Sequence, residues 1–264
     1  MLELKGVYAG YGGGDVLRDI SCSFPRGSLW CVLGPNGCGK TTLLRAMAGL
    51  IPHRGEVLLD GRDVRSWRRR ELAAKIAIMS QINTLYFPYT VYDTLMLGRY
   101  HHMKGGLTGG ASRRDKEAVE RCLTATGLWD MRGRMVNGLS GGQRQRVFLA
   151  QVLAQEPEII LLNEPTNHLD VKHQVELIDH LHAWCAEGGH TVIGVFHDVN
   201  LALRLSKKAV FMRDGQVLKQ GDFTGIADGP FLEALYGLDI AGYMRDSLRT
   251  WEAVSPHPVP SEGQ

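Results

Sequence analysis

The stretch "GPNGCGKT", residues 34 to 41, constrains this chain more than any other part of its sequence. It follows the apolar run "SLWCVL", which is typical of a buried strand, and opens the helix-forming run "TTLLRAMAGL". Glycines at this spacing let backbone N–H groups curl around a phosphate at a helix N-terminus. In this pattern Lys40 can reach the β- and γ-phosphates, and the Thr41 hydroxyl can ligate Mg²⁺. The predicted phosphate-binding residues are Gly34, Pro35, Asn36, Gly37, Cys38, Gly39, Lys40, Thr41 and Thr42.

A second predicted helix N-terminus carries the stretch "LSGGQRQR" in front of the apolar run "VFLAQVLA". Ser140, Gly141 and Gly142 leave backbone N–H groups unobstructed there, which predicts a second anion site. Each motif also has a simpler interpretation: the first as a glycine-rich turn, the second as a loop that Ser140 caps. In the first motif the strand, loop, Lys, Thr and helix follow one another in register, which argues against a simple glycine-rich turn. Because the chain then already has one phosphate site, a second anion site is favoured over a simple capped loop in the second motif.

The other apolar runs predict the fold class. "EIILL" precedes the helix-forming "KHQVELIDHLHAW", and "TVIGVF" precedes "NLALRLS". This alternation predicts an α/β fold with a mainly parallel core sheet that helices cover on both faces. "MLELKGVYAGY", "VLRDISCSF" and "GEVLLDGRDV" alternate apolar with polar residues, which predicts a smaller antiparallel sheet at the edge. Helix-forming stretches dominate from about Val91 to Ala154 and predict an inserted helical subdomain.

Composition excludes several classes of protein. With 30 Lys+Arg against 28 Asp+Glu, the net charge is +2, which is too balanced to imply a nucleic-acid or lipid partner. The five cysteines form no CxxC pair, which argues against a disulfide framework or a zinc site and favours a reducing compartment. Neither a signal-peptide pattern nor a membrane-length apolar run stands out, so we expect a soluble protein whose membrane role comes through a partner.

Taken in order, the motifs resemble those of the nucleotide-binding subunits of ATP-binding cassette (ABC) transporters over about residues 1 to 240. The resemblance implies that Tyr11 in "GYGGGDVL" stacks on adenine and that Gln81 in "MSQ" forms the Q-loop. It also implies that "IILLNE" is the Walker B strand to Glu164, that Asp170 in "NHLD" forms the D-loop, and that His197 in "VFHD" is the switch histidine.

The same resemblance implies an assembly. ABC subunits bind ATP and Mg²⁺ in a head-to-tail homodimer, in which the P-loop of one copy (Gly34 to Thr41 here) and the "LSGGQ" motif of the other sandwich each ATP. The residues that this implies act in trans are Ser140, Gly141, Gly142 and Gln143.

The resemblance also suggests how one P-loop NTPase domain over residues 1–264 is divided. Residues 1–81 and 155–240 are expected to form a RecA-like core with the antiparallel β subdomain. Residues 82–154 are expected to form the helical subdomain with the signature motif, and 241–264 a C-terminal extension. Within these regions, "KGGLTGGAS" is expected to be a mobile loop, and the Pro-rich tail after Val254 to be disordered.

Finer motifs resemble the importer branch that serves iron-siderophores, haem and cobalamin. They include "YFPYTVYDTLMLGRYHH", "TNHLDVKHQ" and "FLEALYGLDI". That branch implies integral-membrane permease subunits, indirect contact with an extracytoplasmic substrate-binding protein, a place at the cytoplasmic face of the cell membrane, and no nucleic acid. Because His101 replaces the proline of the usual "GRYPH", we expect His101 and His102 to be solvated surface side chains rather than ligands.

For catalysis, the resemblance implies that Glu164 polarises the attacking water and that His197 holds this water and the γ-phosphate in line. Lys40 and Gln81 complete the predicted catalytic set, since phosphoryl transfer needs positioning and charge neutralisation more than covalent chemistry. Gln81 would also contact Mg²⁺ and pass its motion to the segment from Leu85 to Arg99, which should face the membrane partner. As alternatives, Glu164 could be a satisfied acid and His197 a helix-entry residue.

Asn163 departs from the family's pattern, which has Asp at this position. The predicted metal ligands are then Thr41, Gln81 and Asn163, and the amide offers Mg²⁺ an oxygen without a charge. We expect ATP to bind and turnover to be slowed by a factor of about 10–1,000. Three accounts stay open: a deliberate substitution that traps the ATP-bound state, which the otherwise intact motifs favour, a natural variant that tolerates the amide, and a natural pseudo-ATPase.

Two other functions compete with a transport ATPase. One is a nucleotide-gated protein that dimerises on ATP and clamps its partner with little hydrolysis. The other is a soluble ABC protein that acts on ribosomes or DNA. The second is disfavoured because such proteins usually carry two cassettes or long insertions, and this chain shows neither.

Overall fold

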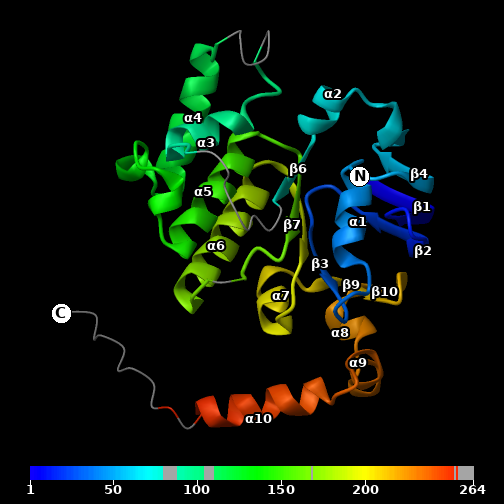
Figure 1. Cartoon of the computed structure of the whole chain (residues 1–264). Coiled ribbons are helices and arrows are strands. Elements are labelled where there is room, and N and C mark those ends of the chain that lie inside the picture. The colour runs from blue at the N-terminus through cyan, green and yellow to red at the C-terminus, as the bar shows by residue number, and fades with distance from the viewer. Residues whose placement is uncertain (80–87, 104–109, 168, 253, 255–264) are drawn as a thin grey trace.

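The computed structural model describes residues 1–79, 88–103, 110–167, 169–252 and 254. Figure 1 shows this part of the chain as an α/β assembly with two β-sheets. Its strands are β1 (Leu2–Gly10), β2 (Asp15–Phe24), β3 (Leu29–Leu33), β4 (His53–Leu59), β5 (Arg62–Asp63), β6 (Ile76–Met79), β7 (Ile159–Asn163), β8 (Thr191–Val195), β9 (Lys208–Arg213) and β10 (Gln216–Asp222). Its α-helices are α1 (Lys40–Met47), α2 (Arg69–Ala73), α3 (Val91–Gly98), α4 (Arg113–Ala125), α5 (Gly141–Ala154), α6 (Val171–Gly188), α7 (Val199–Leu205), α8 (Phe223–Ile226), α9 (Gly229–Tyr236) and α10 (Ile240–Glu252).

The larger sheet has the strand order β10-β9-β3-β8-β7-β6. Neighbouring strands from β9 to β6 run parallel, and β10 pairs antiparallel with β9 at one edge. Parallel neighbours need crossover connections, and helices such as α6 and α7 provide them here. The predicted mainly parallel core sheet is therefore confirmed.

Side chains of the central strands alternate between two hydrophobic cores, one on each face of the larger sheet. On β3, Trp30 and Val32 belong to the core that α1 and the smaller sheet share. Cys31 and Leu33 belong to the opposite core, which α6, α7 and the helices from α3 to α5 share. Because both faces are buried, the β3 sequence is almost continuously apolar, as a covered parallel strand requires.

The smaller sheet has the order β2-β1-β4-β5, and all of its neighbouring strands are antiparallel. Along the start of β1, Leu2 and Leu4 are buried while Lys5 is exposed. This alternation is what a sheet with one solvated face requires, and it confirms the predicted antiparallel sheet.

The helices α3, α4 and α5 follow β6 and precede β7 in the chain, and they lie beside the larger sheet (Figure 1). A fully buried guanidinium ties them together: Arg99 contacts Asp115 at 3.2 Å and Glu156 at 2.8 Å, and donates to the Ala154 carbonyl at 2.7 Å. The predicted helical insertion is confirmed. Its predicted boundary at residue 81 and most of the glycine-rich loop, residues 104–109, lie outside the described residues.

The C-terminal part continues from the β9–β10 hairpin through α8 and α9 to α10, at the end of the molecule opposite α2 (Figure 1). No residue of α10 is buried, and its Met244 sulfur accepts from the Asn200 amide of α7 at 3.1 Å. The tail predicted to be disordered, residues 255–264, lies outside the described residues. Among the helices described, none combines the length and apolar character that a membrane span requires.

Candidate functional site

The parallel strands β3, β8 and β7 have their carboxyl ends side by side, at one edge of the larger sheet. The P-loop, His197 and Glu164 follow these strand ends in the chain. The register places Asn163 of β7 beside Val195 of β8, and Val195 beside Val32 of β3. A cavity of about 330 Å³, which we call the nucleotide cleft, opens at this edge. It is lined by Val16, Asn36, Gly37, Gly39, Lys40, Thr41, Thr42, Glu164 and His197.

The P-loop has a conformation that its glycines permit. Gly34 has φ 151°, and a Cβ there would lie 2.1 Å from the carbonyl oxygen of Met212. Gly39 has φ 101° and is the N-cap of α1. Only glycine combines this backbone conformation with such a close approach, so the loop can curl tightly enough to aim its N–H groups inward.

The Lys40 side chain hydrogen-bonds to the backbone of the P-loop. Its ammonium donates to the carbonyls of Gly34 at 2.7 Å and Pro35 at 2.9 Å, and the side chain is buried. Burial lowers the pKa of the Lys40 amine. A phosphate in the loop would offer this ammonium charged acceptors in place of two neutral carbonyls, which is a stronger interaction.

Thr41 lines the nucleotide cleft and contacts Asn163, the last residue of β7. The Thr41 hydroxyl donates to the amide oxygen of Asn163 at 2.9 Å. These two oxygens suit Mg²⁺, which prefers oxygen ligands, takes few from the protein and takes the rest from phosphates and water. In the part of the chain that is described, no group of three His, Cys, Asp or Glu side chains is arranged to hold a metal.

Glu164 lies at the centre of a small polar cluster. One carboxylate oxygen contacts His197 Nε2 at 2.6 Å, and the other accepts from the Asn167 amide at 2.6 Å. Glu164 also has φ 53°, a conformation that costs a non-glycine residue about 1–2 kcal/mol. The structure thus brings together the predicted Glu164 and His197. It adds Asn167, whose position three residues after the acid is its only signal in the sequence.

Tyr11 is half exposed and lies beside α1, the helix that opens at the P-loop. Its hydroxyl accepts from Arg45 of α1 at 3.0 Å, and the Arg45 guanidinium lies over its ring, 5.6 Å from the centroid. An exposed aromatic beside the P-loop helix suits the predicted role of stacking on adenine. No motif in the sequence pointed to Arg45.

We call Ser140, Gly141, Gly142 and Gln143 the signature loop. Ser140 caps α5: its hydroxyl accepts from the Gln143 N–H at 3.3 Å, and the Gln143 side chain accepts from the Ser140 N–H at 3.1 Å. The N–H groups of Gly141 and Gly142 belong to the first helical turn, whose donors have no acceptor within the helix. The signature loop contributes no residue to the nucleotide cleft of its own chain, so a single copy does not assemble the two predicted anion sites into one.

Asp170 stands at the N-terminus of α6 and is exposed. It accepts from the backbone N–H of His173 at 2.9 Å and contacts His173 Nδ1 at 2.7 Å. The His173 ring also packs on the signature loop, because a Cβ on Gly142 would lie 3.0 Å from it. The predicted D-loop residue is thereby linked to the signature loop of its own chain through His173, which the sequence had not identified.

Gln81 and Cys38 were also predicted to belong to the site. Gln81 lies outside the described residues, so its predicted contacts with metal and water stay predictions. Cys38 is buried in the P-loop, and burial raises the pKa of its thiol, as expected for a small filler.

The expectation that His101 and His102 are solvated is wrong. Both are half-buried, with ring centroids 3.8 Å apart, and burial lowers the pKa of each, that of His101 to about 4. The two rings are half-buried because a distant part of the chain packs on them. Arg70 of α2 donates to the carbonyl oxygens of His101 and Met103 at 2.5 Å and holds α2 over this segment.

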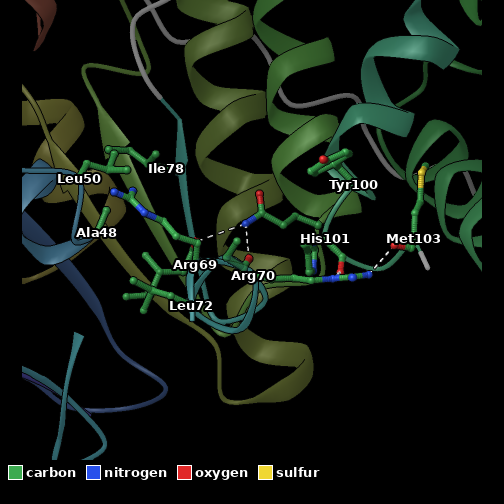
Figure 2. A pocket seen from close by; sticks show the side chains of 12 residues that line it. Ala48, Leu50, Arg69, Arg70, Leu72, Ile78, Tyr100, His101 and Met103 are labelled. Atoms are coloured by element: carbon green, nitrogen blue, oxygen red, sulfur yellow. Dashed lines mark hydrogen bonds between the residues drawn. The ribbon is translucent and has the colours of Figure 1, made fainter. Parts of the chain in front are cut away.

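A second cavity of about 640 Å³, which we call the apolar groove, lies between α2, β6 and the segment after α3. Figure 2 shows its labelled side chains. Leu50, Leu72, Ile78, Tyr100 and Met103 give it apolar walls, and Arg69 and Arg70 add two positive charges. Arg69 is exposed, and within the described residues it makes no hydrogen bond or ion pair.

The fold and the nucleotide cleft define a P-loop nucleotide-binding protein of the ATPase class. Comparison with known proteins gives the family: the ABC transporter family matches residues 17–167. The chain is 38% identical over 230 residues to the ferric enterobactin transport ATP-binding protein FepC of Escherichia coli, covering 87% of this chain and 84% of FepC. It is 37% identical over 246 residues to the hemin import ATP-binding protein HmuV of Pseudomonas putida, covering 91% of this chain and 94% of that protein.

A solved structure agrees with these relatives. The dimeric bacterial ABC transporter cassette MJ0796 superimposes with a TM-score of 0.73 at 29% identity, covering 84% of this chain and 98% of that cassette. The chain belongs to the ABC transporter family and is one of its ATP-binding domains.

Replacement of Lys40 by Ala tests the nucleotide cleft. We expect ATP affinity to fall roughly 10- to 100-fold, because about 1.5–3 kcal/mol of charged hydrogen bonding is lost. Titration with a fluorescent ATP analogue measures this. Lys5→Ala, at an exposed lysine of β1, is the control that should bind like the wild type. Equal affinity for Lys40→Ala would contradict the assignment.

Proposed function

We propose that this chain is the ATP-hydrolysing subunit of an importer for an iron-siderophore, haem or cobalamin-type substrate, and that ATP drives it into a head-to-tail homodimer. The relatives support the substrate class, since FepC is named for ferric enterobactin transport and HmuV for hemin import. One observation supports the dimer. The signature loop is exposed and does not line the nucleotide cleft of its own chain.

In this proposal the two halves of each ATP site come from different copies. The P-loop and Lys40 hold the phosphates, and Tyr11 stacks on the base. The partner copy supplies its signature loop, whose free N–H groups and helix dipole favour the γ-phosphate. Closing the sandwich also removes water from the phosphates, which strengthens every charged contact there.

Catalysis then falls to the polar cluster around Glu164. Mg²⁺ held by Thr41, Asn163 and Gln81 would neutralise phosphate charge when it is bound. In this proposal Glu164 accepts a hydrogen bond from the attacking water, and Asn167, which donates to its carboxylate, keeps that carboxylate oriented. His197 contacts Glu164 at 2.6 Å, and its proposed role is to hold both the water and the γ-phosphate.

Replacement of Glu164 by Gln tests this assignment. The amide keeps the size of the side chain but removes the base, so we expect hydrolysis to fall at least about 100-fold while ATP still binds. The ATP-bound dimer should then accumulate, as size-exclusion chromatography with light scattering would detect. Full ATPase activity, or a chain that stays monomeric with ATP, would contradict the proposed mechanism.

The side chain of Asn163 bears on whether the chain hydrolyses ATP or mainly binds it. Its amide oxygen keeps the contact with Thr41 but lacks the charge that the family's Asp would bring to the metal. We propose that the chain binds ATP well and hydrolyses it slowly. The alternative function, a nucleotide-gated clamp with little turnover, rests on this same residue.

Asn163→Asp separates the two. We expect the ATPase rate to rise about 10- to 1,000-fold, because a preorganised charge returns to the metal site, with ATP affinity nearly unchanged. Steady-state phosphate release measures the rate, with Asn137→Asp as a control for an added carboxylate on the short turn before α5. No gain in turnover would favour the clamp over the transport ATPase.

We propose that the apolar groove receives a cytoplasmic segment of the membrane permease. Its apolar walls suit an amphipathic segment, and Arg69 suits an acidic side chain on it. Through this contact the subunit would sit at the cytoplasmic face of the membrane and act indirectly with an extracytoplasmic substrate-binding protein. The predicted Gln81 and the segment from Leu85 follow β6, one wall of the groove, in the chain.

Arg69→Glu tests the contact with the permease. Reversal of an exposed charge should leave folding and basal ATPase activity intact but weaken association with the permease about tenfold or more, as like charges meet. Co-purification with the permease in detergent measures this, and mass spectrometry of the complex identifies the cargo. Arg245→Glu on α10, at the opposite end of the molecule (Figure 1), is the matched control. Equal recovery of permease with both variants would argue against the groove.

A further inference from the structure

One hydrogen bond joins the helix of the signature loop to Pro165, the residue after Glu164. Gln145 lies in the first turns of α5, and its side-chain amide donates to the carbonyl oxygen of Pro165 at 2.6 Å. Pro165 follows Glu164 directly and is buried. The proline ring fixes φ, so a displacement of this carbonyl passes readily to the peptide bond between Pro165 and Glu164.

The segment after Glu164 is held from the other side by α6. The Gln174 amide donates to the Leu169 carbonyl at 3.1 Å, and Asp170 caps α6. Arg146, next to Gln145, pairs with Glu176 of α6 at 3.0 Å. The start of α5, the loop after Glu164 and the start of α6 are therefore one connected unit.

We propose that Gln145 is a positioning residue that couples the two ATP sites of the dimer. The inference rests on the proposed function, in which the signature loop of a chain contacts the neighbour's ATP while Glu164 of that chain acts on its own. A shift of α5 upon contact with the neighbour's phosphate reaches Pro165 through the Gln145 amide and sets the position of Glu164. ATP bound at one site thus affects the rate of hydrolysis at the other.

A coupling of this kind has a measurable size. Couplings between sites in proteins typically change affinity or population about 5- to 150-fold, and a single hydrogen bond belongs at the lower end. We therefore expect loss of the Gln145 contact to lower kcat about fivefold and to bring the Hill coefficient for ATP towards 1. Binding of ATP to the isolated chain should change less than about twofold, because Gln145 does not line the nucleotide cleft.

Three variants of Gln145 in the full chain separate this role from packing. Gln145→Met keeps the length and removes the donor, Gln145→Glu keeps the shape and removes the donor, and Gln145→Lys restores a donor. ATPase rates across ATP concentrations give kcat, half-saturation and the Hill coefficient, and thermal unfolding monitors stability. Gln151→Met, further along α5, is the control expected to match the wild type.

The expected result is a lower kcat and Hill coefficient for the Met and Glu variants, with recovery in Gln145→Lys. The inference is overturned if the Met and Glu variants keep wild-type kcat and cooperativity, or if the Lys variant fails together with a loss of thermal stability. A wild-type chain that forms no dimer with ATP would instead remove the proposed function, a failure visible before any Gln145 variant is made.

Discussion

The parallel pairing of β3, β8 and β7 is the constraint on which the nucleotide cleft depends. Because Val32, Val195 and Asn163 lie side by side in register, the residues that follow them emerge at the same edge of the sheet. A slip of one strand by one residue would turn its side chains to the opposite face and bury Asn163 or expose an apolar neighbour. The two hydrophobic cores on the faces of the sheet therefore fix the chemistry at its edge.

Much of this arrangement could be predicted from the sequence because its signals are contiguous. The P-loop has its strand, glycines, Lys40 and Thr41 within a dozen residues, and the order of the motifs placed Glu164 and His197 in the same site. Contacts between distant segments gave no such signal. Asn167, Arg45 and Gln145 gain their roles only when the chain folds, and the burial of His101 depends on Arg70 from another helix.

Asn163 separates the shape of the site from its charge. The amide takes the place of a carboxylate, accepts from Thr41 and sits in the same row as Val195, so the geometry of the cleft is kept. In the proposed mechanism, what changes is the electrostatic balance next to Lys40 and Glu164, since an amide would bring no negative charge to the Mg²⁺ that it would help to hold. Binding of ATP depends mainly on the shape of the cleft, and the rate of phosphoryl transfer depends mainly on its charge.

The contacts of Glu164 bear on the behaviour of a subunit that has no partner. Both carboxylate oxygens are already engaged within the chain, one by Asn167 and one by His197. Each carboxylate oxygen can still accept a second hydrogen bond, so a water molecule can join the amide and the histidine at this carboxylate. The carboxylate of a lone subunit is therefore already held in one orientation, and neither a nucleotide nor a partner has to order it.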